Sequence, residues 1–318
     1  MLALLAAAFF CALSVRLSNT SPPPETSWPE GMPDDWANSR IDLSALQAPN
    51  TEYVCPMDRD VSSKQPGFCP RCRMKLVAAT PVDPQAHPYP VELTTRPRVT
   101  KPNEPIQLLF AVQDPQTSEP VRNYELVHER IYHLFVVGQD LGFFLHTHPE
   151  PQPDGTMRLD VKVPAEGMYR ILSDFYPKGG TPQLVTNTLL VGAAESLPQR
   201  SAQLRADLAP QRGENIGMEL TSFPSRPKAH AKTQISLRVT PNDGIEPYLG
   251  VMAHVLAASE DLVDMMHSHP LQVTDHGSSN KELLFEMTFP RTGVYRIWVQ
   301  TQRKGIVNTV AFNIPIAG

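Results

Sequence analysis

The chain has 318 residues, of which 41% are hydrophobic and 19% are charged, and its formal net charge is −5. This balance is ordinary for a soluble globular protein of two or three domains and gives no reason to expect a nucleic acid as a partner. The 33 prolines, about twice the average usage, argue against a helical protein, because proline interrupts helices and suits turns and strand edges.

The first 17 residues contain an apolar run that stops at Arg16. A run of about fifteen apolar residues is short for a membrane span and fits the core of a signal peptide, so we expect an exported protein of the periplasm or the extracellular space. A basic segment before the run is missing, which leaves two alternatives: residues 1–17 stay as an N-terminal anchor, or they form an apolar tail without a targeting role. A membrane is expected as a partner only through this segment. Residues 18–50 are rich in Pro, Ser, Asp and Asn, and we expect a linker there.

Three of the four cysteines lie close together, at Cys55, Cys69 and Cys72. Cys69-Pro-Arg-Cys72 is a C-x-x-C turn that directs two thiolates to one point, and Cys55 supplies a third from a preceding strand. Three cysteines cannot pair completely among themselves, which favours a metal site, or one disulfide and one thiol, over a disulfide framework. Met57 and Met74 each lie two residues from a cysteine. Thiolate and thioether ligands select Cu(I), or Zn(II) when a fourth donor completes a tetrahedron.

This module, residues 51–78, resembles the small heavy-metal-binding domain near the N-terminus of many copper and silver efflux adaptor proteins and of some metal-pumping ATPases. The family pattern is Tyr-x-Cys-Pro-Met-His-Pro, then Pro-Gly-x-Cys-Pro-x-Cys-Gly-Met-x-Leu, and the chain matches it at Tyr53, Cys55, Pro56, Met57, Pro66, Gly67, Cys69, Pro70, Cys72, Met74 and Leu76. Asp58 and Arg73 stand where the family has His and Gly. The resemblance implies a metal site made of Cys55, Met57, Cys69, Cys72 and Met74. Asp58 either replaces the histidine of the family with a carboxylate ligand or leaves that position without a ligand. The alternative is a structural turn closed by a Cys69–Cys72 disulfide.

The rest of the chain is a duplication. Short motifs recur in the same order, for example Gly167-Met-Tyr-Arg-Ile and Gly293-Val-Tyr-Arg-Ile, and the repeat is too long for a solenoid unit. We place copy 1 at residues 88–193 and copy 2 at residues 213–317. Both copies contain short runs of alternating polarity separated by turn residues, which is typical of an antiparallel sandwich of about seven strands. The predicted fold is therefore mainly β, with the cysteine module followed by two tandem immunoglobulin-like or cupredoxin-like β-sandwiches.

Six of the ten histidines form one pattern that occurs in both copies. Its members are His133, His146 and His148 in copy 1 and His254, His267 and His269 in copy 2. In each copy the second and third histidines are two positions apart on a predicted strand, so both side chains point to one face. The repeated pattern suggests two related metal sites, because histidine is the commonest side-chain metal ligand.

The length of the loop between the two histidine-bearing strands decides whether the first histidine joins the other two. A two-residue loop within Gly138-Gln-Asp-Leu-Gly142 pairs His133 with His146, and a four-residue loop pairs His133 with His148. Either register gathers three imidazoles on one face, whereas a three- or five-residue loop turns His133 to the other face. Three imidazoles with an open fourth position suit Cu(II) or Zn(II).

Further soft or basic groups occur near the pattern: Met252, Met265 and Met266 in copy 2, and His128 in copy 1. The competing interpretation is structural, because His-x-His-Pro can cap a strand with its imidazoles hydrogen-bonded to loop backbone, and the methionines can be core residues. The duplicated pattern also resembles all-β domains of secreted bacterial proteins, described as uncharacterised or heavy-metal-associated, that often follow the same cysteine module.

The leading hypothesis is an exported heavy-metal-binding protein, with copper favoured over zinc, that sequesters ions or hands them to an efflux system or another envelope protein. The alternative is an interaction protein of tandem β-sandwiches whose N-terminal module is stabilised by a structural zinc ion. We expect no enzyme, since nucleophile-elbow, phosphate-loop, dinucleotide and zinc-protease motifs are missing. A blue-copper centre needs a cysteine with two histidines, and no cysteine follows Cys72. A three-histidine copper site with an open position leaves copper redox activity as an alternative.

Overall fold

The computed structural model describes residues 52–55, 61–70, 75–79, 88–192, 203–277 and 279–318, and these residues form strands, turns and loops without any helix. The mainly β prediction is therefore confirmed for this part of the chain. In the same residues no helix is long and apolar enough to span a membrane. The predicted signal segment and the linker over residues 18–50 lie outside the described residues.

The cysteine module is a small antiparallel sheet in which β1 (Glu52–Val54) lies between β2 (Ser62–Ser63) and β3 (Val77–Ala79). Its hydrogen bonds continue past the strands, since the amide of Cys55 donates to the carbonyl of Val61 at 2.9 Å. Cys55 and Cys69 are both buried and pack in one cluster with Leu76. The module thus encloses the two cysteines that the structure describes.

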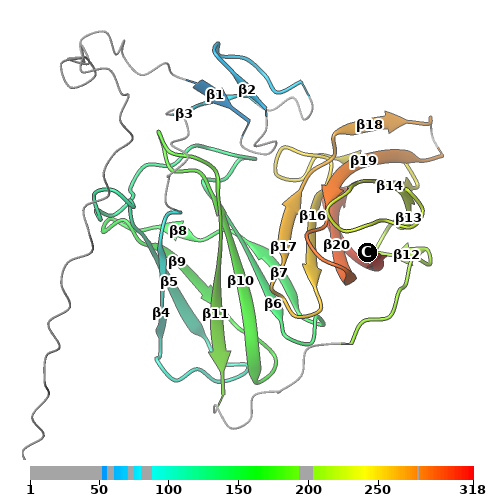
Figure 1. Cartoon of the computed structure of the whole chain (residues 1–318). Helices are drawn as coiled ribbons and strands as arrows, with labels where there is room; N and C mark the ends of the chain where they lie inside the picture. Colours follow the sequence, from blue (N-terminus) through cyan, green and yellow to red (C-terminus); the bar gives the residue numbers. More distant parts are fainter. Residues whose placement is uncertain (1–51, 56–60, 71–74, 80–87, 193–202, 278) are drawn as a thin grey trace, which may run out of the picture. The chain divides into compact units, whose positions relative to one another are not determined.

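Copy 1 is a sandwich of two antiparallel four-stranded sheets (Figure 1, cyan to green). One sheet has the order β4 (Val91–Arg96), β5 (Ile106–Val112), β9 (Met157–Val161) and β8 (Glu150–Pro151). The other has the order β11 (Gln183–Val191), β10 (Gly167–Phe175), β6 (Tyr132–Gly138) and β7 (Phe144–Thr147).

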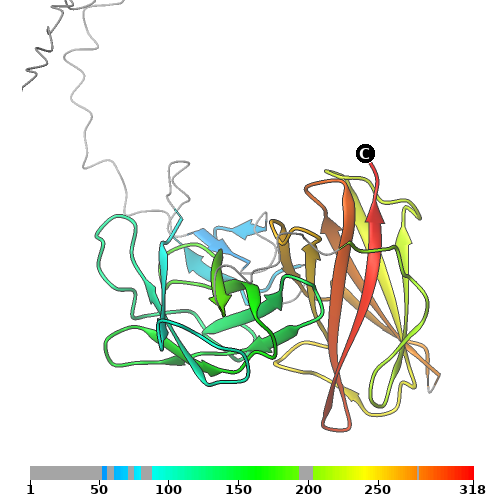
Figure 2. The ribbon, with the colours of Figure 1, turned by 90° about the horizontal axis from the view of Figure 1, so that it is seen from below.

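Copy 2 repeats this arrangement with two five-stranded sheets. One has the order β12 (Gln211–Arg212), β13 (Gly217–Phe223), β14 (Lys232–Thr240), β19 (Lys281–Thr288) and β18 (Gln272–Asp275). The other has the order β15 (Ile245–Glu246), β20 (Gly293–Arg303), β16 (His254–Ser259) and β17 (Met265–Ser268), with β21 (Ile306–Ile316) paired to β20. Figure 2 shows β20 and β21 as one long hairpin.

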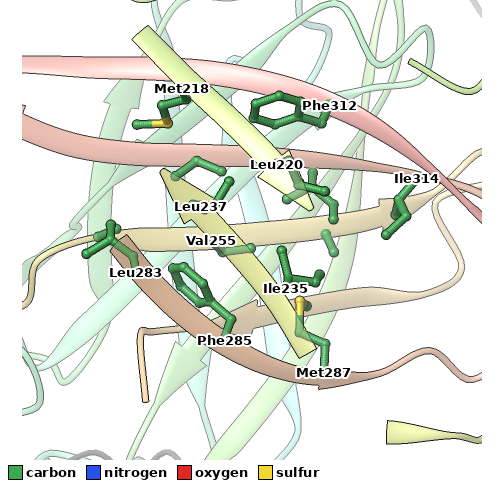
Figure 3. Packing of buried hydrophobic residues seen from close by; sticks show 14 of the residues in the cluster. Met218, Leu220, Ile235, Leu237, Val255, Leu283, Phe285, Met287, Phe312 and Ile314 are labelled. Carbon is green, nitrogen blue, oxygen red and sulfur yellow. The ribbon is translucent and has the colours of Figure 1, made fainter. Parts of the chain in front are cut away.

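The core of each sandwich comes from the alternation of side chains along its strands. In copy 2, Leu237 and Phe285 of one sheet face Val255 and Phe312 of the other (Figure 3). All four are at most 2% exposed. Met252 and Met266 pack against this same cluster as partly buried residues, so their side chains contribute to the core of copy 2.

Strands β6 and β16 are buried along their whole length. In β6, Leu134 and Val136 face the core of copy 1, whereas the alternate residues Phe135 and Val137 belong to a different apolar cluster. We call this the inter-repeat cluster; its buried members are Phe135, Val137, Leu141 and Leu172 from copy 1 and Leu256, Ala258, Leu262, Met265 and Trp298 from copy 2. A sheet that buries both faces explains why residues 132–137 read as a nearly continuous apolar run.

Candidate metal centre between the repeats

The histidine-bearing hairpins have the four-residue loop among the registers considered above. In copy 1, Phe135 pairs with His146, and the amide of Gly138 donates to the carbonyl of Phe143 at 3.0 Å, so that the same register places His133 opposite His148. Copy 2 has the equivalent register, since Leu256 pairs with His267. All three histidines of each copy therefore lie on the same face, which is the face directed at the inter-repeat cluster.

The three imidazoles of copy 1 converge on one point. Nδ1 of His133 lies 3.2 Å from Nε2 of His146 and 3.2 Å from Nε2 of His148. One nitrogen from each of the three rings lies within 4.8 Å of the other two. His133 and His146 are 2% and 8% exposed, so the point of convergence is largely closed to solvent.

Copy 2 repeats this geometry. Nδ1 of His254 lies 3.3 Å from Nε2 of His267 and 2.8 Å from Nε2 of His269. The three ligand nitrogens again lie within 4.8 Å of one another. We call the two groups the copy 1 set and the copy 2 set, after the copy that supplies the histidines. Both sets bring together one Nδ1 and two Nε2 atoms in nearly the same arrangement.

A loop carbonyl fixes the orientation of the first imidazole in each set. Nε2 of His133 contacts the carbonyl of Val127 at 3.0 Å, and Nε2 of His254 contacts the carbonyl of Tyr248 at 3.1 Å. A carbonyl oxygen only accepts hydrogen bonds, so Nε2 of each ring donates and carries the proton. In the neutral imidazole Nδ1 is then left as a bare lone pair directed into the set.

The second imidazole of each set is held by the other repeat. Nδ1 of His146 lies 2.8 Å from Oε1 of Gln300 on β20, and Nδ1 of His267 lies 2.7 Å from Oδ2 of Asp174 on β10. Both partners are acceptors, and the Gln300 amide is oriented by donation from its Nε2 to the hydroxyl of Thr309 at 3.0 Å. Nδ1 of both histidines therefore carries a proton, and in the neutral ring of His146 Nε2 is the bare nitrogen. Outer acceptors of this kind are typical of histidines that bind metals.

These proton positions leave lone pairs that face each other. In copy 1 the bare Nδ1 of His133 and the bare Nε2 of His146 are 3.2 Å apart, and no proton lies between them. Two ring nitrogens that bind one ion at about 2.0 Å with tetrahedral angles lie about 3.3 Å apart. The nitrogen spacing thus fits a first-row ion such as Cu or Zn, and a cation there would remove the repulsion between the lone pairs.

Burial favours the neutral form of five of these imidazoles. Desolvation, followed by the charge of neighbouring histidines, lowers the pKa of His133 to about 4 and that of His148 to about 3. The same causes hold the pKa of His146, His254 and His269 well below the usual value. Neutral imidazole is the form that binds metals, so these five histidines are in the binding form at neutral pH.

His128, the further candidate of copy 1, lies beside the copy 2 set. Its ring centroid is 3.9 Å from that of His269. Its backbone has φ = +49° in a tight turn closed by hydrogen bonds between Val127 and Arg130, a conformation that costs energy for a residue other than glycine. Its Nε2 is buried without a hydrogen-bond partner among the described residues. Burial lowers the pKa of His128 to about 3.

Asp174 and Gln300 were not singled out from the sequence. Asp174 is the seventh residue after Gly167 and Gln300 is the seventh after Gly293, so the two occupy equivalent positions of the repeated Gly-x-Tyr-Arg motif. A polar residue at the equivalent position of both strands was the available signal. Their partners lie in the other repeat, which a strand pattern within one repeat does not reveal.

The cysteine module contacts the loop that supports the copy 1 set. Val54 and Val77 of the module pack in one cluster with Tyr176 and Val127 of copy 1. Val127 is also the residue whose carbonyl accepts from His133. Of the other predicted ligands of the module, Met57, Asp58, Cys72 and Met74 lie outside the described residues. Met265, also considered as a soft ligand, is a buried member of the inter-repeat cluster.

Solved structures that match this chain include the Escherichia coli adhesin FdeC, with 11% identity over 77% of this chain and 69% of that chain and a TM-score of 0.24. The Yersinia pseudotuberculosis adhesin InvE has 9% identity over 73% of this chain and 61% of that chain, with a TM-score of 0.23. A structure of carbohydrate-binding modules from the β-sandwich superfamily has 11% identity over 74% and 95% of the two chains, with a TM-score of 0.21. Likeness at this level says nothing about what this chain binds.

No protein with a curated description matches the chain. The family model described as "Heavy metal binding domain" matches residues 52–79, as the cysteine motif predicted. A second family model matches twice, over residues 85–192 and 212–318, and its two matches together span more than half of the chain. The chain therefore belongs to the family described as "Domain of unknown function (DUF8832)", of which it contains two copies.

Proposed function

We propose that this protein binds copper in preference to zinc, at the cysteine module and at the two histidine sets, and that it sequesters these ions or hands them over outside the cytoplasm. The observation that supports the histidine sites most strongly is the pair of facing lone pairs on His133 and His146. The heavy-metal-binding domain at residues 52–79 supports metal binding at the other end of the chain. Copper is favoured because, among divalent first-row ions, Cu(II) binds nitrogen ligands more tightly than Zn(II).

The alternative of a purely structural histidine pattern predicts imidazoles whose nitrogens are all paired with loop backbone. Nε2 of His133 and of His254 does contact a loop carbonyl. Nδ1 of the same two residues, however, faces another imidazole instead of a backbone group. This difference between the two ring nitrogens favours metal ligation.

Export rests on the apolar N-terminal segment, and hand-over rests on the two kinds of site in one chain. Thiolate ligands suit Cu(I), whereas neutral imidazoles suit Cu(II) or Zn(II). The contact of the module with Val127 links the module to the loop that holds His133. An efflux component or another envelope protein is the partner that we propose for hand-over, and we propose no catalytic activity.

Metal stoichiometry on the full chain tests this function. The protein is dialysed against Cu or Zn and measured by mass spectrometry beside a Cys55/Cys69/Cys72→Ser variant and a His146/His148/His267/His269→Ala variant. We expect the first variant to lose one ion and the second to lose about two more. Wild-type protein that holds no more Cu or Zn than a variant carrying both sets of substitutions would reject the function. Loss of metal from the Cys variant alone would leave the histidines structural.

A further inference from the structure

The two histidine sets are in direct contact with each other. The ring centroid of His146 lies 5.0 Å from that of His254 and 6.1 Å from that of His267. The ring of His133 lies 5.9 Å and 5.8 Å from the same two rings. Spacings within a set are similar, at 4.9–5.5 Å in copy 1 and 4.4–5.5 Å in copy 2. The six imidazoles therefore form one cluster with two points of convergence.

Resting on the metal-binding function above, we propose that the six histidines form one paired metal centre between the repeats, with two unequal positions. The position at the copy 2 set takes the first divalent cation, and the position at the copy 1 set takes the second. Ions held in adjoining sets are neighbours in a dry interior, so each affects the other through its charge. Two Cu(II) ions are also close enough for their unpaired electrons to couple.

Each position is completed by the opposite repeat. Gln300 of copy 2 orients His146 of copy 1, and Asp174 of copy 1 orients His267 of copy 2. The backbone positions of these partners are equivalent as well, since Asp174 pairs with His133 across β10 and β6, and Gln300 pairs with His254 across β20 and β16. A single repeat has three histidines but lacks the acceptor that fixes one of them. The centre is thus a property of the two repeats together.

The charges around the two positions differ. The partner at the copy 2 set is the carboxylate of Asp174, whereas the equivalent partner at the copy 1 set is the neutral amide of Gln300. A carboxylate behind a histidine raises its basicity and strengthens metal binding. This difference favours the first cation at the copy 2 set.

A titration with Cu(II) followed by electron paramagnetic resonance tests the paired centre. The full chain carrying Cys55→Ser, Cys69→Ser and Cys72→Ser isolates the histidine sites, and the unmodified chain serves as the reference for folding. We expect the first equivalent to give the spectrum of a single Cu(II) ion. The second equivalent should broaden that spectrum, produce a half-field transition and lower the signal per copper. A His267→Ala variant should bind one ion and show no half-field transition.

Two isosteric substitutions test the order of filling. Asp174→Asn removes the carboxylate, and Gln300→Glu adds one at the equivalent position. We expect the two copper affinities to differ at least tenfold in the parent chain, and to approach each other in Asp174→Asn because the tighter one falls by about 10–100-fold. In Gln300→Glu they should approach each other because the weaker one rises. The spectrum of the first equivalent should change in both variants, because copper then divides between the two positions as their affinities approach each other.

The possible failures are distinguishable. Two bound Cu(II) ions whose spectra add as isolated spins would overturn the paired centre while leaving metal binding in place. Two affinities that Asp174→Asn leaves unchanged would overturn the order of filling. Absence of any copper bound by histidine would overturn this inference together with the proposed function of the histidine sets.

Discussion

Nδ1 of His267 donates to Oδ2 of Asp174 at 2.7 Å, although the two residues belong to different copies of the repeat. The equivalent pair in the opposite direction is His146 and Gln300, at 2.8 Å. The duplication has thus produced two histidine sets, each of which depends on a residue that the other copy supplies. The same exchange places the acceptors so that Nε2 of His146 faces His133 and Nε2 of His267 faces His254.

The metal-free protein should become less stable as the pH falls below 6.5. The pKa of His133 is lowered to about 4 and that of His148 to about 3 in the folded chain, against about 6.5 for an exposed histidine. Between these values the unfolded chain binds protons that the folded chain does not, so each residue removes up to about 1.4 kcal/mol per pH unit. Urea unfolding of metal-free protein at pH 7.5, 6.5, 5.5 and 4.5 measures this loss. A His148→Gln variant should show a shallower dependence, and a stability that rises on acidification would contradict the burial of neutral imidazoles.

Bound metal should raise the thermal stability of the chain. An ion that binds only the folded state at a concentration of one hundred times its dissociation constant adds about 2.7 kcal/mol per site. We therefore expect Cu(II) or Zn(II) to raise Tm in differential scanning calorimetry and a chelator to reverse the shift. The control is a His146→Ala, His267→Ala variant that keeps the cysteine module. An equal rise of Tm in that variant would assign the stabilisation to other sites.

Phe135 should link the inter-repeat cluster to metal binding. Its ring lies 4.2 Å from that of His146 and 4.6 Å from that of His267, so it contacts both sets. Phe135→Ala should cost about 3–5 kcal/mol of unfolding free energy and also weaken copper binding. Phe110→Ala is the matched control, because Phe110 is equally buried but lies in the core of copy 1. If both variants lose the same copper affinity, the effect is general destabilisation and the specific link is wrong.

His128 should cover the copy 2 position. Its ring lies against His269 at 3.9 Å between centroids, and removing it opens that side of the set to solvent. His128→Ala should therefore speed the release of copper from the copy 2 position several-fold, measured by stopped-flow transfer to a chelator. Leu249→Ala changes the equivalent turn residue of copy 2, which has φ = +52°, and should leave this rate unchanged. An unaltered rate in His128→Ala would show that the ring does not limit release.

The strand pattern was sufficient to place the second and third histidines of each copy on one face, but it left open the loop length that decides whether the first histidine joins them. The observed four-residue loop places Leu141 at φ = +58° and Leu262 at φ = +55°. Leucine is not a residue that indicates a left-handed turn, so these two positions give no local signal for the loop length. Burial of Leu141 and Leu262 in the inter-repeat cluster stabilises the loop.

The relation between the two sets could not be predicted from the repeat pattern. Each copy on its own predicts an isolated three-histidine site. Contact between the sets depends on Phe135 and Leu256 facing away from their own sandwich cores and packing together. Apolar residues on both faces of β6 and β16 show that the second face is covered, but they do not identify what covers it.

The most direct test of the central claim is the anomalous scattering of a crystal of the full chain loaded with copper, recorded at the copper absorption edge. The account predicts one peak inside each histidine set, each bound by Nδ1 of the first histidine and Nε2 of the other two. Peaks confined to the cysteine module, with the histidine nitrogens paired only to protein groups, would contradict it.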